Sequence, residues 1–114
     1  MADCLFCKIR DGQIPATFVY QDEELLAFRD INPAAPTHVL LIPREHVSSA
    51  DALEERHAAL AGKLVLRAAA LARDLGLVDG GYRLTMNNGA GAGQSVFHLH
   101  LHLLGGRRFS WPPG

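Results

Sequence analysis

The sequence has no apolar run near the length of about 20 residues that a bilayer-spanning helix needs. Its first residues, Met1-Ala2-Asp3, lack the positive charge that opens a signal peptide. Cysteine is also scarce: 2 residues cannot build a disulfide-rich scaffold, and free thiols are usual in reducing compartments. From these shortages we expect a cytoplasmic protein with no membrane partner.

A surplus of basic charge is missing as well. The 11 lysines and arginines are balanced by 12 acidic residues, for a net charge of −1, whereas domains that bind nucleic acid through its phosphates are strongly basic. We therefore expect no nucleic-acid partner. What the sequence does contain, 48% hydrophobic and 20% charged residues in 114 positions, is typical of a single globular domain over residues 1–114.

Apolar patterning predicts short strands and a short helix near the N-terminus. Runs of β-favouring residues bounded by Gly, Pro, Asn and Asp indicate strands, which we expect at residues 17–20, 25–28, 38–42, 82–86 and 97–104. A helix of one or two turns is expected at residues 4–9, before Gly12 and Pro15 stop it. The order and the short connections favour an α+β fold with an antiparallel sheet.

A long amphipathic helix is expected over residues 51–75. One face of a 3.6-residue period is apolar, and its members are Leu53, Leu60, Leu64, Ala68, Leu71 and Leu75. Gly76 follows as a C-terminal cap. We expect the apolar face to pack against the sheet and His57 to face solvent from the polar side.

The last expected strand alternates histidine with leucine. Because side chains alternate along a strand, His98, His100 and His102 share one face, with neighbouring Cα atoms about 6.5 to 7 Å apart. Three interpretations are open: a solvent face that is histidine by chance, a metal site, or a nucleophilic imidazole flanked by two others that orient it and handle protons.

The segment before this strand favours the nucleophilic interpretation. Residues 89–95 are rich in glycine, which gives their backbone N–H groups the freedom to grip a phosphate. Ser95 adds a hydroxyl donor. Glycine also marks ordinary turns, so the loop points to chemistry only in combination with the histidines.

The run His98–Leu104 has the pattern His-φ-His-φ-His-φ-φ, where φ is apolar, and with it the sequence resembles the histidine triad (HIT) superfamily. Further matching segments are residues 26–33, 36–38, 41–43, 93–96, 105–107 and 111–114. The C-terminal segments resemble the histidine triad nucleotide-binding branch. The dinucleoside polyphosphate hydrolases and uridylyltransferases share the triad but not this ending.

The resemblance implies a HIT-like fold, with a five-stranded antiparallel sheet, one long and one short helix, and a homodimer that joins two sheets into ten strands. It implies a purine nucleoside phosphoramidase that acts on nucleoside 5′-phosphoramidates, aminoacyl-adenylates included, and releases the nucleoside monophosphate, such as AMP. His100 would attack the α-phosphorus and form a nucleotidyl-histidine. His102 and His38 would belong to the proton network, and Ser95 would hydrogen-bond the phosphate or leaving group. No metal cofactor is required for this chemistry.

The resemblance also assigns nucleotide contacts. Asp30 would accept hydrogen bonds from the ribose hydroxyls, although by itself it reads as a turn carboxylate before Asn32 and Pro33. The other expected nucleotide-binding residues are Phe6, Ile9, Phe28, Ile31, Asn87, Gly93, Gln94, Ser95, Val96, His100, His102 and Trp111. Trp111 would act from the C-terminal tail, at the active site of the second subunit.

The spacing Cys4-x-x-Cys7 fits two ligands of a zinc site. We expect His46 and His98 to complete a structural Zn²⁺ site that is catalytically silent, because a saturated site has no open position. His98 would then not shuttle protons, which leaves His100 and His102 for the chemistry. The alternative is two buried thiols in a short helix.

Two other functions remain open at this point. One is a nucleotide-binding regulatory or scaffold protein with little turnover. The other is a dinucleoside polyphosphate hydrolase. Hydrolysis rates on a phosphoramidate and on diadenosine polyphosphates distinguish all three.

Overall fold

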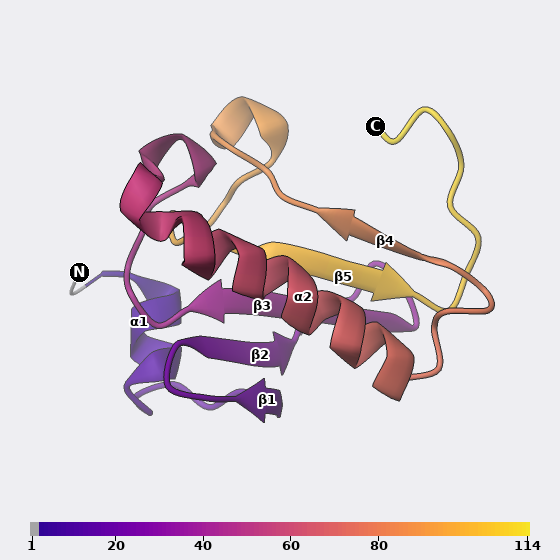
Figure 1. Ribbon diagram of the computed structural model, residues 1–114, viewed down its shortest axis with the longest axis horizontal. Coiled ribbons are helices and arrows are strands. Elements are labelled where there is room, and N and C mark those ends of the chain that lie inside the picture. The colour runs from indigo at the N-terminus through magenta and orange to yellow at the C-terminus, as the bar shows by residue number, and fades with distance from the viewer. Residues whose placement is uncertain (1–2) are drawn as a thin grey trace.

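Five antiparallel strands form one sheet in the order β1-β2-β3-β5-β4 (Figure 1). The computed structural model describes residues 3–114. The strands are β1 (Phe18–Gln21), β2 (Leu25–Arg29), β3 (Thr37–Pro43), β4 (Tyr82–Thr85) and β5 (Leu101–Gly105). The α-helices are α1 (Leu5–Arg10) and α2 (Ala58–Asp74). The predicted α+β class, with a five-stranded antiparallel sheet and one long and one short helix, is confirmed.

The two helices cover opposite faces of the sheet, with α2 lying across one face and α1 packed against the other (Figure 1). Alternation along the strands divides the core accordingly. Leu25, Ala27, Val39, Leu41, Leu101 and Leu103 pack with Leu64, Ala68 and Leu71 of α2. Leu26, Phe28, Leu40 and Ile42 pack with Phe6 and Ile9 of α1. The central strand β3 is buried on both faces, as its continuous apolar run predicts.

The long helix begins later than the sequence pattern predicts. Two 3₁₀ turns, η1 (Ala50–Ala52) and η2 (Glu55–His57), occupy the start of the expected range. Leu53 lies between them with an extended backbone (φ −67°, ψ 142°) and still packs against the core. Glu54 then caps the next turn in a reciprocal capping box with His57. The apolar period therefore identified the buried positions correctly but not the helix start.

Within residues 3–114, no helix combines the length and the hydrophobicity needed to cross a membrane.

His57 is buried, so its predicted place on the solvent face is wrong. Its side chain is only 4% exposed. The ring Nδ1 accepts the backbone N–H of Glu54 at 2.9 Å, and Nε2 lies 3.0 Å from Oε2 of Glu45. The ring lies in the turn that precedes α2, where the capping box draws it inward, rather than on the polar face of the helix.

The last strand is shorter than predicted. It starts at Leu101, so His98 and His100 precede it. The N–H of Leu99 donates to the carbonyl of Val47 at 2.6 Å, so this segment follows the chain after β3 instead of joining the regular ladder. The predicted alternation persists nonetheless: Leu99 lies in the core beneath α2, whereas the rings of His98 and His100 contact Phe6 of α1.

Candidate functional site

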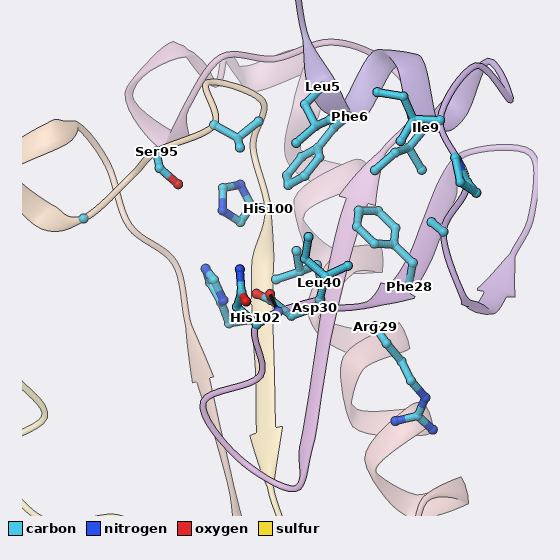
Figure 2. A pocket seen from close by; sticks show the side chains of 17 residues that line it. Leu5, Phe6, Ile9, Phe28, Arg29, Asp30, Leu40, Ser95, His100 and His102 are labelled. Atoms are coloured by element: carbon cyan, nitrogen blue, oxygen red, sulfur yellow. Dashed lines mark hydrogen bonds between the residues drawn. The ribbon is translucent and has the colours of Figure 1, made fainter.

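A pocket of about 310 Å³ opens on the α1 face of the sheet (Figure 2). Its apolar wall contains Phe6, Ile9, Phe28, Leu40 and Val96, and its polar side contains Asp30, Ser95, His100 and His102. Phe6 joins the two sides, because its ring packs edge-on against Phe28 at 5.4 Å and against His100 at 5.1 Å between ring centroids. The pocket therefore offers an apolar slot that ends at two imidazoles.

His100 is oriented by its own backbone. Its ring lies between Ser95 and Phe6 (Figure 2), and the residue is 8% exposed. Nδ1 lies 2.7 Å from the carbonyl oxygen of His98, and only an N–H can bond to a carbonyl, so Nδ1 carries the proton. In the neutral ring, Nε2 therefore keeps its lone pair. An imidazole nitrogen with a free lone pair in a pocket is a competent nucleophile.

A chain of hydrogen bonds fixes the neighbouring ring. The N–H of Ala34 donates to Nδ1 of His38 at 3.0 Å, so the proton of a neutral His38 is on Nε2. That nitrogen lies 2.9 Å from Nδ1 of His102, which must then accept. The proton of His102 is therefore on Nε2, a buried atom that has no hydrogen-bond partner among residues 3–114. His102 itself lines the pocket.

Burial keeps both of these rings neutral. It lowers the pKa of His102 to about 4, with a smaller contribution from the neighbouring rings of His100 and His38. Burial also lowers the pKa of His38, against the opposing effect of the Asp30 carboxylate.

The interpretation of the histidines as a chance solvent face is wrong, since His98 and His100 are at most 8% exposed.

Asp30 serves a turn and the pocket at once. Its Oδ1 accepts the N–H of Asn32 at 2.9 Å, as in the turn-carboxylate interpretation. Its Oδ2 lies 3.5 Å from Nε2 of His38, and the residue lines the pocket. One carboxylate oxygen thus remains for a ligand hydroxyl.

The glycine-rich loop contains a 3₁₀ turn, η3 (Ala90–Ala92). Gln94, only 3% exposed, holds it in place: Oε1 accepts the N–H of Gly89 at 2.8 Å, and Nε2 donates to the carbonyls of Ser48 and Val96. Gly93 leaves the turn with φ 96°, a conformation that favours glycine. The side chain of Gln94 is thus committed to the loop and not to the pocket.

Most of the predicted nucleotide contacts line the pocket. They are Phe6, Ile9, Phe28, Asp30, Ile31, Gly93, Ser95, Val96, His100 and His102. Asn87, Gln94 and Trp111 do not line it; the Asn87 amide lies near Gly93, and Trp111 is 82% exposed on the tail. Lining residues that the sequence analysis missed are Leu5, Ile14, Pro15, Ala16, Arg29, Asn32 and Leu40. Leu40 could have been found from strand alternation, whereas residues 14–16 carry no periodic signal.

Beside the pocket, four potential metal ligands converge from segments far apart in the sequence: Cys4, Cys7, His46 and His98. Their ligand atoms are separated by 3.3 Å (Cys4–His98), 3.4 Å (Cys7–His46), 3.6 Å (Cys7–His98) and 3.2 Å (His46–His98). Tetrahedral zinc, with bonds of about 2.3 Å to sulfur and 2.0–2.1 Å to nitrogen, places its ligands roughly 3.3 to 3.8 Å apart. The four residues, hereafter the Cys₂His₂ cluster, fit that ion.

The electrostatics of the Cys₂His₂ cluster also suit a cation. His98 has its Nε2 within 2.8 Å of the Pro43 carbonyl, so that nitrogen carries the proton and the Nδ1 lone pair points into the cluster. Burial lowers the pKa of His98 to about 4, which keeps its ring neutral. Burial and the nearby Cys4 raise the pKa of the Cys7 thiol. A divalent ion would supply the positive charge that two adjacent thiolates lack.

Fold and site together define an α+β protein with an imidazole-lined pocket, and comparison with known proteins identifies the class. The sequence pattern of the HIT domain family matches residues 11–109. The chain therefore belongs to the HIT domain family, which confirms the predicted membership of the histidine triad superfamily.

Individual relatives are similar over nearly their whole length. A HIT family hydrolase from Legionella pneumophila superimposes with a TM-score of 0.96 and is 51% identical, covering 98% of this chain and 100% of that one. An uncharacterized HIT-like protein of Synechocystis sp. is 54% identical over 98% of this chain and 97% of its own. A 14 kDa zinc-binding protein of Zea mays is 50% identical over 96% of this chain and 87% of its own.

Proposed function

We propose that this protein is a purine nucleoside phosphoramidase of the histidine triad nucleotide-binding branch, which hydrolyses nucleoside 5′-phosphoramidates and aminoacyl-adenylates to the nucleoside monophosphate. The observation that carries the proposal is the orientation of His100. Its Nδ1 proton is bonded to the His98 carbonyl, so Nε2 keeps its lone pair at the pocket. His102 also lines this pocket, and its buried Nε2–H has no partner among residues 3–114. The hydrolase named among its structural neighbours supports the same general chemistry.

A nucleotide fits this pocket in one orientation, with its base at the apolar wall and its phosphate at the polar side. The purine base lies in the apolar slot against Phe6 and Phe28, where aromatic rings favour stacking and edge contacts. The ribose hydroxyls donate to Oδ2 of Asp30, whose other oxygen is held in the turn. The α-phosphoryl group then lies at the polar end, beside Ser95 and His100.

The reaction proceeds in two displacements. Nε2 of His100 bonds to the α-phosphorus as the bond to the leaving group breaks. In a phosphoramidate this is the P–N bond, and the departing nitrogen takes a proton; in an aminoacyl-adenylate it is a P–O bond, and a carboxylate leaves. Water then cleaves the nucleotidyl-histidine, which releases the nucleotide and restores that proton. His102 gives the proton to the leaving nitrogen and takes one back from water, because the negative phosphoryl group favours a protonated imidazole beside it. Oδ2 of Asp30, 3.5 Å from Nε2 of His38, gives the His38 N–H a second acceptor at that stage.

The Cys₂His₂ cluster is proposed to hold a structural Zn²⁺ that ties α1 to the chain before β5. All four positions of a tetrahedral ion would be filled by protein, so the ion has no open position for substrate, and the chemistry needs no further metal. A zinc-binding relative that is 50% identical supports this assignment. The reduced thiols that it requires fit a cytoplasmic location.

A homodimer is proposed for the same chain. Among residues 3–114, strand β4 pairs with β5 alone, which leaves one of its edges open to a second copy. Val65 and Leu66 are 51% and 71% exposed on α2, and a second copy would cover this apolar surface. Pairing of two β4 edges would give the ten-stranded sheet that the family resemblance implies.

Steady-state hydrolysis of a fluorogenic adenosine 5′-phosphoramidate tests the proposed activity, with diadenosine polyphosphates assayed in parallel. We expect turnover of the phosphoramidate that far exceeds turnover of the diadenosine compounds. Nucleotide binding without turnover would support the regulatory function instead. Faster cleavage of diadenosine polyphosphates would make the protein a dinucleoside polyphosphate hydrolase.

A further inference from the structure

A second hollow adjoins the nucleotide pocket. It has a volume of about 680 Å³ and is open to solvent. Leu5, Ser95 and Val96 line both this hollow and the nucleotide pocket, so the two spaces meet at these residues. Ser95 belongs to the polar side of the pocket and lies beside His100 (Figure 2). The hollow therefore begins next to the position where the chemistry is proposed to occur.

The substrate of the proposed reaction must extend beyond the nucleotide pocket. In the proposed orientation the ribose lies at Asp30, and the α-phosphoryl group reaches Ser95 and His100. The leaving group is bonded to that phosphorus and continues from there. Because Ser95 lines the second hollow as well, the leaving group of a bound substrate would lie in this hollow.

Apolar side chains supply much of the lining of the hollow. Phe97 is 52% exposed although the next residue, His98, is fully buried. Leu5, at the start of α1, is 42% exposed and lines the same hollow. Single exposed apolar residues are ordinary, but two of them beside one concave surface are typical of a binding site. An aromatic ring also offers a large contact area to an apolar ligand.

The charge of the hollow comes from Asp3. This exposed residue contributes a carboxylate to the lining. Cys4 and His46 line the hollow too, but they belong to the Cys₂His₂ cluster and would be held by its ion. The remaining charged group among the lining residues is therefore negative. It attracts a cationic ligand and repels an anionic one.

We propose that this hollow is a leaving-group subsite that selects aminoacyl-adenylates whose amino acid has an apolar or aromatic side chain. That side chain packs on Phe97 and Leu5, and the free α-ammonium group pairs with Asp3. The inference rests on the proposed function and narrows it to one class of substrate. In an amino acid phosphoramidate the nitrogen is bonded to phosphorus and the free end is a carboxylate, which Asp3 repels.

The test measures binding without turnover, by calorimetry with analogues in which a sulfamate replaces the phosphate. The probes are 5′-O-sulfamoyladenosine and its N-phenylalanyl, N-aspartyl and N-(acetylphenylalanyl) derivatives. The affinity of each derivative is divided by that of the unsubstituted compound, so the ratio reports the subsite alone.

The variants are Phe97→Ala and Asp3→Asn, with circular dichroism to monitor the fold. Val78→Ala is the matched control, because Val78 is 54% exposed, close to the 52% of Phe97, and lines neither the pocket nor the hollow. Light scattering on Phe97→Ala tests whether a second copy of the chain covers Phe97 instead.

We expect the phenylalanyl compound to bind the wild type about 10-fold more tightly than sulfamoyladenosine, as partial burial of an apolar side chain predicts, and the aspartyl compound to gain nothing. Phe97→Ala should lower the phenylalanyl ratio about 5-fold. Asp3→Asn should lower it about 2- to 3-fold, the range of an exposed ion pair, and should leave the acetylphenylalanyl ratio unchanged. Val78→Ala should change neither ratio. If Phe97→Ala does not fold, Asp3→Asn with the acetylated and free compounds decides the question.

Equal affinities of the phenylalanyl and unsubstituted compounds would overturn the inference, and so would a phenylalanyl ratio that neither variant lowers. Conversion of a dimer to a monomer by Phe97→Ala would assign Phe97 to an interface and overturn it as well. Since binding is measured without cleavage, the proposed function fails separately: absence of turnover with the expected ratios would remove the activity and keep the subsite.

Discussion

His38 and His102 form a direct imidazole–imidazole hydrogen bond across two neighbouring strands, with 2.9 Å between Nε2 of the first and Nδ1 of the second. They are diagonal neighbours: the register pairs His102 with Leu40 and His38 with Leu104. The Ala34 N–H fixes the direction of the bond from the loop side. The protonation of a pocket residue is therefore set by a residue of β3 that does not itself line the pocket.

Replacing His38 by Ala should impair catalysis more than binding. Without the Nε2–H of His38, His102 can place its proton on either nitrogen, and its ring loses a support. We expect kcat/KM on an adenosine phosphoramidate to fall about 10- to 100-fold, the usual cost of an outer-shell partner, with AMP affinity within about twofold. Thr37→Val, on the adjacent position of β3, is the control. A large loss of AMP affinity with kcat unchanged would contradict the role assigned to His38.

Replacing His100 by Ala or Asn should nearly abolish turnover. Loss of a covalent nucleophile typically lowers kcat/KM by roughly 10³-fold or more. AMP should still bind, since the apolar slot and Asp30 remain. Mass spectrometry of quenched wild-type reactions should find the nucleotidyl adduct on His100. An adduct on another residue would show that the nucleophile is misassigned.

Stability should decrease as the pH falls below 6.5. Folding lowers the pKa of His102 to about 4 and also lowers that of His38, whereas both have values near 6.5 in an unfolded chain. Between those values the unfolded state binds protons that the folded state excludes. The free energy of unfolding should thus decrease by up to about 1.4 kcal/mol per pH unit for each such histidine. Urea unfolding at pH 7, 6 and 5 measures this. His38→Ala should reduce the slope, and a flat profile would contradict the prediction.

Protein purified without chelator should contain close to one zinc per chain. The Cys₂His₂ cluster presents all four ligands from a folded scaffold, so binding of the ion is linked to folding. Elemental analysis measures the content, and thermal unfolding should shift downward after the metal is stripped. Cys4→Ser/Cys7→Ser should lose the metal, whereas Ser49→Ala, which changes none of the four ligands, should retain it. Native protein without zinc would support the alternative of two buried thiols.

Light scattering at micromolar concentration should give twice the chain mass of 12.4 kDa. The open edge of β4 and the exposed apolar positions on α2 are the surfaces that a second copy would cover. A mass near that of one chain would refute the homodimer.

Much of the fold follows from local pattern. The strict alternation of Leu101 and Leu103 with His102 predicts which side chains enter the core, because a strand has only two faces. The recurrence of Leu64, Ala68 and Leu71 predicts the buried face of α2 for the same kind of reason. The convergence of the cysteines with His46 and His98 agrees with the expectation, which started from the Cys-x-x-Cys spacing.

Other features depend on tertiary contacts that no local pattern encodes. His57 is buried because its ring caps a turn and meets Glu45, a residue 12 positions away. Gln94 holds the glycine-rich turn through the carbonyl of Ser48, which is 46 positions away. The backbone carbonyl of His98 orients His100, and a main-chain acceptor has no signature in the side-chain sequence.

The placement of the helices on opposite faces of the sheet has a consequence for how this protein tolerates change. Along β5, Leu101 and Leu103 face the core beneath α2, while His102 faces the pocket beneath α1. Substitutions at successive positions of this strand should therefore have different effects. Substitution of the leucines should lower the yield of folded protein, and substitution of the histidine should lower turnover. The sheet separates the two faces, so substitutions in the core beneath α2 that preserve the fold should leave the chemistry in the pocket unchanged.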